Sequence, residues 1–121
     1  MSKKQDRIGQ FLRLSKEEFE EYVKTKDVNR LAQAGEKLWN AFSMLIEGMV
    51  GRKISRFKEL KDAVFDVYKE RLDRTVLIAF ENAYSLHRFF YKGWTEDISI
   101  EEEQYKLVYD LIELLRKRYK V

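Results

Sequence analysis

Residues 27–50 form the segment that most limits what this chain can fold into. At 100° per residue its polar side chains follow one narrow stripe, made of Asn29, Gln33, Glu36, Asn40, Ser43 and Glu47. Much of the remaining circumference from Leu38 onward is apolar. A helix that is apolar over most of its surface must be covered by neighbours on several sides. We therefore expect a central helix with four deeply buried residues, Leu38, Phe42, Leu45 and Met49, while Gln33, Asn40 and Glu47 face water or line a groove. Gly35 would let a neighbouring helix approach closely.

Helical periodicity also dominates the rest of the chain, and no alternating strand pattern exceeds a few residues. Apolar residues recur at three- and four-residue steps near 6–26, 56–71, 75–92 and 99–119. The 121 residues suit one domain. The predicted fold class is all-α: a single domain, residues 1–121, folded as a compact bundle of about five mostly antiparallel helices.

Two of these segments carry specific expectations for burial. Residues 6–26 should bury Ile8, Phe11, Leu12, Phe19, Tyr22 and Val23. Residues 56–71 should bury Phe57, Leu60, Val64, Val67 and Tyr68.

Turn and cap residues mark the expected helix ends. Gly48 and Gly51 lie near the end of the central helix, and the expected N-terminal caps are Ser55, Asp73 or Thr75, and Ser99. Ser15 and Glu18 have capping-box spacing, which leaves open a break within the first helix.

The content of metal-binding residues excludes several classes of site. The chain has no Cys and a single His, so it has neither a disulfide framework nor a thiolate metal site, and zinc would need a dimer that contributes both histidines. We expect no metal and no cofactor.

The N-terminus lacks the apolar run of a signal peptide, and no segment approaches the ~20 apolar residues of a membrane span. We therefore expect a cytoplasmic protein without membrane contact. The heavy use of Lys, Arg and Glu is typical of thermophilic proteins.

The only histidine, His87, lies in the aromatic stretch ENAYSLHRFFYKGW and is the candidate catalytic residue. Helical geometry places it on the apolar side of its helix, aligned with Phe80 and Ala83. That position favours a packed, hydrogen-bonded histidine. A catalytic role would require a partner such as a base, an arginine or a bound phosphate, and the adjacent Arg88 is the candidate cation.

Three consecutive aromatic residues follow the histidine. Phe89, Phe90 and Tyr91 span about 200° of a helix, whereas a core stripe is little more than 100° wide. One of them should face outward, either as a lone exposed ring or as part of a partner surface. With Trp94 nearby, we favour the partner surface and expect a twofold homodimer through these four residues.

Two basic clusters are candidates for nucleic-acid contact. GRKISRFK places Arg52, Lys53, Arg56 and Lys58 around Phe57, and the C-terminus places Arg116, Lys117, Arg118 and Lys120 around Tyr119. Cations beside an aromatic ring can hold phosphates and stack a base. The stronger explanations are structural: a solvated loop accounts for the first cluster, and the helix dipole accounts for the second.

Two segments, AGEKLWNAFSMLIEGM (34–49) and ENAYSLHRFFYKGW (81–94), resemble the archaeal PaREP family of small paralogous proteins. That family is grouped with the HEPN superfamily of helical, typically dimeric domains and has no established activity of its own. The resemblance therefore implies a HEPN-like bundle and a dimer.

Many HEPN proteins are ribonucleases that use an arginine followed about four to six residues later by a histidine. Here that arginine would have to occupy one of positions 80–82, which hold Phe, Glu and Asn, and the nearest upstream arginine is Arg74. We therefore expect a non-catalytic HEPN-like dimer that binds RNA or a protein partner. The alternative is a divergent, metal-independent ribonuclease that uses His87, with Arg88 supplied across a dimer interface.

Overall fold

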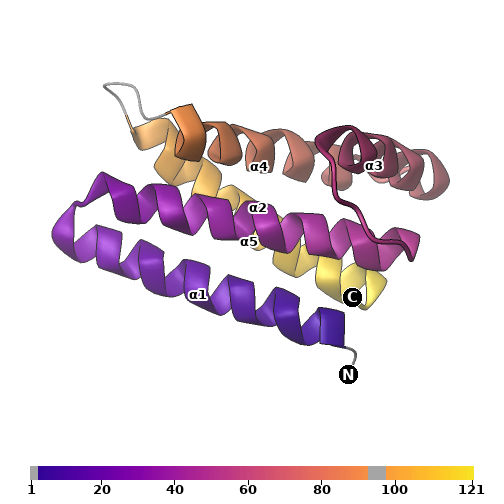
Figure 1. Ribbon diagram of the computed structural model, residues 1–121, viewed down its shortest axis with the longest axis horizontal. Coiled ribbons are helices and arrows are strands. Elements are labelled where there is room, and N and C mark those ends of the chain that lie inside the picture. Colours follow the sequence, from indigo (N-terminus) through magenta and orange to yellow (C-terminus); the bar gives the residue numbers. More distant parts are fainter. Residues whose placement is uncertain (1–2, 93–97) are drawn as a thin grey trace.

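The computed structural model describes residues 3–92 and 98–121, and within these ranges it contains five helices and no strand (Figure 1). The helices are α1 (Lys3–Thr25), α2 (Val28–Val50), α3 (Phe57–Arg71), α4 (Arg74–Lys92) and α5 (Ser99–Tyr119). Their ends differ from the predicted ones by three residues at most. The predicted all-α bundle is therefore confirmed.

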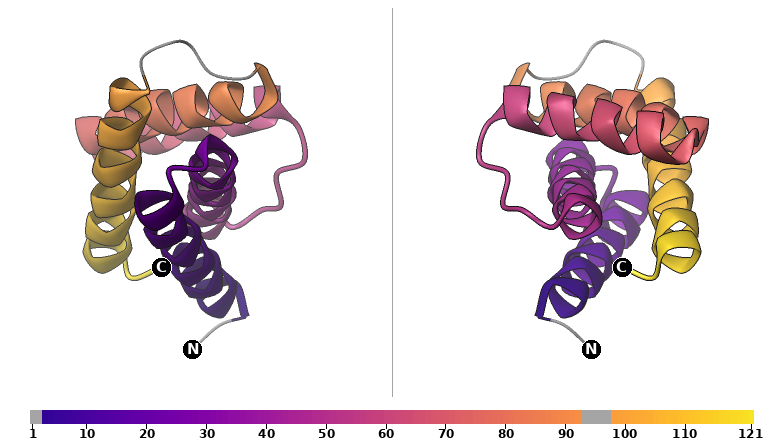
Figure 2. Two further views of the ribbon diagram at one scale, coloured as in Figure 1. Left: turned by 90° about the vertical axis from the view of Figure 1, so that its left-hand side faces the viewer. Right: turned by 90° about the vertical axis from the view of Figure 1, so that its right-hand side faces the viewer.

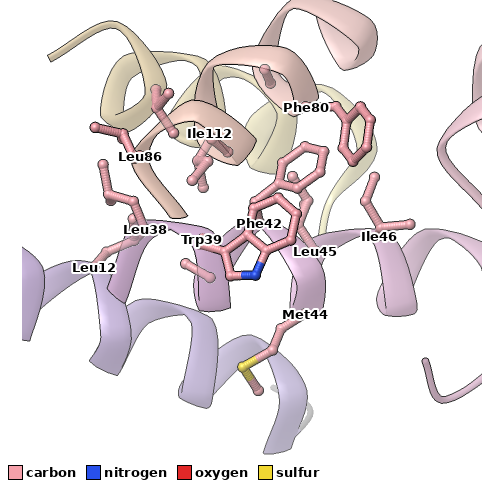
Figure 3. Packing of buried hydrophobic residues seen from close by; sticks show 14 of the residues in the cluster. Leu12, Leu38, Trp39, Phe42, Met44, Leu45, Ile46, Phe80, Leu86 and Ile112 are labelled. Atoms are coloured by element: carbon pink, nitrogen blue, oxygen red, sulfur yellow. The ribbon is translucent and has the colours of Figure 1, made fainter. Parts of the chain in front are cut away.

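Helix α2 occupies the centre of the bundle and contacts each of the other four helices (Figure 1). Leu38, Phe42 and Leu45 are completely buried, as predicted, and their side chains meet those of α4 and α5 (Figure 3). Met49 is only partly buried, contrary to prediction, because it lies in the last turn, where the helix leaves the core. The predicted close approach occurs at Gly35, where an added Cβ would lie 3.2 Å from the Leu86 Cβ on α4.

The predicted helix ends are correct at two positions. Gly51 ends α2 in the left-handed conformation at φ 73°, and its N–H donates to the Glu47 carbonyl at 2.9 Å. Asp73 precedes α4, and its carboxylate accepts from the Thr75 N–H at 3.0 Å.

Two other cap assignments are wrong, and the break left open at Ser15 does not occur. Neither α3 nor α5 has a side-chain cap, because Arg56 and Ile98, rather than Ser55 and Ser99, hold the capping positions. Helix α1 runs unbroken through Ser15, which is fully buried. The Ser15 hydroxyl donates to the Ala34 carbonyl at 2.8 Å and is hydrogen-bonded to the Tyr105 hydroxyl at 2.9 Å, so it joins three helices instead of capping one.

The expectations for burial in α1 and α3 hold for most of the named residues. Those that are buried as predicted are Ile8, Leu12, Tyr22, Leu60, Val64 and Val67, while Phe11, Phe19 and Tyr68 are partly buried. Val23 is 51% exposed because it is turned about 100° from the buried Tyr22. Phe57 is 44% exposed because it lies at the mouth of a groove instead of in the core.

None of the helices in the described ranges has the length and apolar character needed to cross a bilayer. The cytoplasmic location stays a prediction.

Candidate functional site

A groove of about 290 Å³ opens between α2, the start of α3 and α4. We call it the His87 groove. It is lined by Trp39, Asn40, Ser43, Ile54, Ser55, Arg56, Phe57, Leu60 and His87. The loop before α3 is held at its rim by Glu47, whose carboxylate accepts from the Ile54 N–H at 2.8 Å.

His87 pairs with a carboxylate from the central helix. Its Nδ1 lies 2.8 Å from Oε1 of Glu36, and the two side chains are 27% and 15% exposed. The imidazole also stacks on the Trp39 indole, with ring centroids 4.7 Å apart and planes 21° apart. The histidine is therefore hydrogen-bonded and packed on one side, as its position on the apolar face predicts, while part of its ring remains open to the groove.

Pairing with His87 offsets part of the cost of burying the negative charge of Glu36. Burial raises the pKa of Glu36, while the hydrogen bond and the charge of His87 lower it, and burial has the larger effect. A carboxylate hydrogen-bonded to a ring nitrogen fixes the orientation of the imidazole.

Five rings from three helices form a continuous aromatic surface beside the groove. We call it the aromatic platform: Trp39, Phe57, Tyr84, His87 and Tyr91. Within it, Phe57 and Tyr84 have centroids 4.8 Å apart, and His87 meets the edge of Tyr91 at 4.8 Å. Phe57 and Tyr91 are 44% and 69% exposed, so their rings are available to a ligand.

The three consecutive aromatic residues of α4 behave differently from one another. Phe89 is 6% exposed, Phe90 is partly buried against the core, and Tyr91 faces outward. The expectation that one of the three is exposed is thus correct. Trp94 lies outside the described residues.

Of the predicted cations, only Arg56 lines the His87 groove. Its side chain is 83% exposed and lies 3.9 Å from Glu59. Arg52 lies 3.7 Å from Asp66, and Lys53 and Lys58 are exposed on the same loop and the first turn of α3. The three are therefore neighbours of the groove in sequence and do not line it.

Arg88, the other candidate for catalysis, lines a different groove from the one that contains His87. It lines a second groove, of about 320 Å³, together with Glu81, Tyr84, Ser85, Phe89, Lys92 and Glu101. Because Arg88 follows His87 directly, it is turned about 100° away along α4. Arg88 therefore does not border the His87 groove.

The C-terminal basic cluster has a structural role at two of its positions. Arg118 and the Tyr119 hydroxyl each lie 2.5 Å from Oδ2 of Asp73, which ties the end of α5 to the start of α4.

Sequence reasoning missed Glu36 and Trp39 as members of this site. Glu36 is 51 residues from His87, so no local spacing predicts their contact. The available signal was the polar stripe of α2, on which Glu36 lies one turn from the groove residue Asn40. Within the described residues, no three His, Asp or Glu side chains come together in a group that could hold a metal ion.

A model of the archaeal PaREP1/PaREP8 family matches residues 10–109, which include the whole aromatic platform. No curated protein and no solved structure matches the sequence.

Proposed function

This chain belongs to the archaeal PaREP1/PaREP8 family, and we propose that it is a non-catalytic module that binds single-stranded RNA through the aromatic platform and the His87 groove. A continuous cluster of rings beside a small groove, in which Phe57 and Tyr91 are exposed, carries this proposal. Every nucleobase has a π-face, so a row of rings binds bases with little dependence on sequence. A groove of about 290 Å³ is at the lower end for ligand sites, which suits a single base better than a larger ligand.

Charge on the rim supports RNA over an apolar peptide. Arg56 extends from the groove, and Lys53 and Lys58 are exposed close to it in sequence, where they can contact phosphates. Asn40 on the groove wall offers a donor and an acceptor for a base edge, and Ser43, whose hydroxyl donates to the Trp39 carbonyl at 3.0 Å, offers an acceptor.

Binding to labelled RNA oligonucleotides, followed by fluorescence anisotropy, tests the proposal. Phe57→Ala and Tyr91→Ala should each weaken binding of single-stranded RNA by roughly 5- to 150-fold, because removal of one stacked ring costs about 1–3 kcal/mol. Phe65→Ala is the matched control: this phenylalanine of α3 is 40% exposed and lies outside the groove lining.

A change of charge gives a second, independent readout. Arg56→Gln should weaken binding to all sequences alike, and the slope of log affinity against log salt concentration should become shallower by about 0.7, the value for one phosphate of a single strand. The exposed Arg13 of α1 serves as the control for Arg→Gln. Equal affinity of the wild type and of both ring variants for RNA would contradict the proposal and leave a protein partner as the ligand.

The proposal includes a HEPN-like bundle that acts as a homodimer, as the family resemblance implies. The five-helix all-α architecture supports the first part. The dimer surface expected from sequence consisted of Phe89, Phe90, Tyr91 and Trp94. Among the three of these that the structure describes, Tyr91 alone is strongly exposed, and it belongs to the aromatic platform. We therefore assign Tyr91 to RNA contact and place the dimer surface elsewhere.

The pairing of His87 with Glu36 favours a second candidate function, a metal-independent ribonuclease. In this alternative His87 acts as the general acid or base, Glu36 orients its imidazole, and Arg56 supplies the positive charge near the scissile phosphate. Cleavage of RNA in the presence of a chelator, abolished in His87→Ala with the fold intact, would establish this activity. A decrease in stability alone in His87→Ala would instead indicate a packing role.

A further inference from the structure

A strip of aliphatic side chains is exposed along the outer edge of α4 and α5. Leu107 and Leu114 are each 41% exposed, Leu111 between them is partly buried, and Ile78 on α4 is 46% exposed. The three leucines are four and three residues apart, so they form one line along α5. We call this set the α4–α5 face.

Polar contacts at both ends show that the α4 and α5 residues of this face lie side by side. At one end, Gln104 is hydrogen-bonded to Ser85 at 3.0 Å and to Asn82 at 3.2 Å. At the other end, Arg118 meets Asp73. Gln104 and Arg118 lie on the same line of α5 as the leucines, which are therefore framed by polar pairs.

Ile78 joins the patch from the α4 side. It lies one turn before Asn82, whose amide donates to the Ile78 carbonyl at 2.9 Å. Figure 2 shows α5 at one side of the molecule, with α2 on its inner side and α4 across its upper end. The outer line of leucines thus faces away from the core.

We propose that the α4–α5 face binds a second copy of this chain in an antiparallel, twofold arrangement. This inference concerns the dimer of the proposed function and does not depend on RNA binding. A twofold axis near residues 110 and 111 places Leu107 opposite Leu114 of the second copy. The apolar strip of each copy is then covered by the same strip of the other.

The charges of α5 are arranged so that the helix is complementary to a second, antiparallel copy of itself. Its first turns carry Glu101, Glu102 and Glu103, and its last turn carries Arg116, Lys117 and Arg118. Glu102 is bound by the Tyr22 hydroxyl of α1 and Arg118 by Asp73, so the charges left for antiparallel pairing are those beside the leucine line. Glu103 and Lys117 are both exposed and flank the leucine line, so they are the pair that should meet across the interface.

The available area predicts a dimer that exchanges with monomer. Helix α5 is about 32 Å long and about 10 Å wide, and α4, which crosses it at a large angle (Figure 2), adds the part around Ile78, which gives about 400 Å² per copy. The total of about 800 Å² is below the size of stable interfaces and within the range of weak, transient ones. The association should therefore depend on concentration in the micromolar range.

Sedimentation equilibrium over a micromolar concentration series tests the face directly. The wild type should be dimeric at the upper end, Leu107→Glu should be monomeric throughout, and the control Phe65→Glu, a change of equal exposure on α3, should dimerise as the wild type does. A wild type that stays monomeric, or a Leu107→Glu variant that dimerises normally, would overturn the proposal.

A charge exchange identifies the twofold arrangement and separates it from a folding defect. Glu103→Lys and Lys117→Glu should each weaken the dimer about fivefold or more, and the double variant should recover most of the wild-type affinity. The two residues are 14 positions apart, about 21 Å along one helix, so recovery can arise only between copies. Additive effects in the double variant would refute the antiparallel pairing. Because the readout is dimerisation without RNA, its failure leaves the RNA proposal separately testable.

Discussion

Asp73 holds the start of α4 to the end of α5, and its ionisation should be measurable as stability. Burial raises the pKa of Asp73, but hydrogen bonds from Tyr119, Arg118 and Thr75 outweigh this effect and lower the pKa from 3.8 to about 2. The Asp73 side chain is 10% exposed but its partner Arg118 is 41% exposed, so solvent screens part of this ion pair. Because one pKa unit corresponds to about 1.4 kcal/mol, the ionised carboxylate contributes about 2 kcal/mol at neutral pH.

The sign of the pH dependence follows from the lowered pKa in the folded state. The contribution is complete above pH 3.8, the ordinary value, and disappears as pH falls towards 2. Asp73→Asn keeps the size of the side chain and an acceptor for the Thr75 N–H but removes the charge. We expect it to lower the free energy of unfolding by about 2 kcal/mol at neutral pH, and by about half as much near pH 3.

Urea unfolding followed by circular dichroism at several pH values measures this difference. Asp66→Asn is the control, because Asp66 is 62% exposed and lies 3.7 Å from Arg52, and such surface pairs contribute about 0–1 kcal/mol. A gap between wild type and Asp73→Asn that stays constant from neutral pH to pH 3 would refute the reasoning. So would an equal decrease in the control.

Three further changes test the core and the site. Leu45→Ala should lower the free energy of unfolding by about 2–5 kcal/mol in urea, and a change within ~0.5 kcal/mol would mean that the site is not core. Ser15→Ala leaves the buried Tyr105 hydroxyl without this partner and should cost about 1–3 kcal/mol; a thermal melt equal to that of wild type would argue against the bond. Burial raises the pKa of Glu36, so wild-type stability falls as pH rises through that folded-state pKa. Glu36→Gln should therefore have a higher melting temperature than wild type at neutral pH and the same melting temperature under acidic conditions. A lower melting temperature of Glu36→Gln at neutral pH would show that pairing with His87 outweighs burial.

The sequence was sufficient for the fold because periodicity reports which side of each helix is buried. The central position of α2 could be predicted because the helix is apolar around most of its circumference. The cap at Asp73 could be predicted because it depends on a contact with Thr75, only two residues later in the sequence. Prediction failed where tertiary packing overrides a local rule. Ser15 has capping-box spacing but points inward to the Ala34 carbonyl, and no local pattern could indicate that partner.

The candidate site was predicted in part for the same reason. His87 and the outward Tyr91 follow from helix geometry, which depends only on position along α4. The pair formed with Glu36 depends on the close approach of α2 and α4 at Gly35, which is a property of the whole bundle. A periodic pattern identifies which face is buried, but it does not identify which residue of another helix meets that face.

The two proposals, RNA binding and pairing with a second copy, use opposite sides of α4. His87 and Ile78 are nine residues apart, which turns them by 180° at 100° per residue. His87 faces the groove shared with α2 and α3, and Ile78 faces the edge shared with α5. The sequence predicted instead a dimer through Phe89, Phe90, Tyr91 and Trp94, and on that arrangement a second copy would cover the Tyr91 ring of the aromatic platform. With the seam at Ile78 the groove stays open in each copy, so two binding sites can act on one RNA strand, and their combined affinity can exceed that of either site alone.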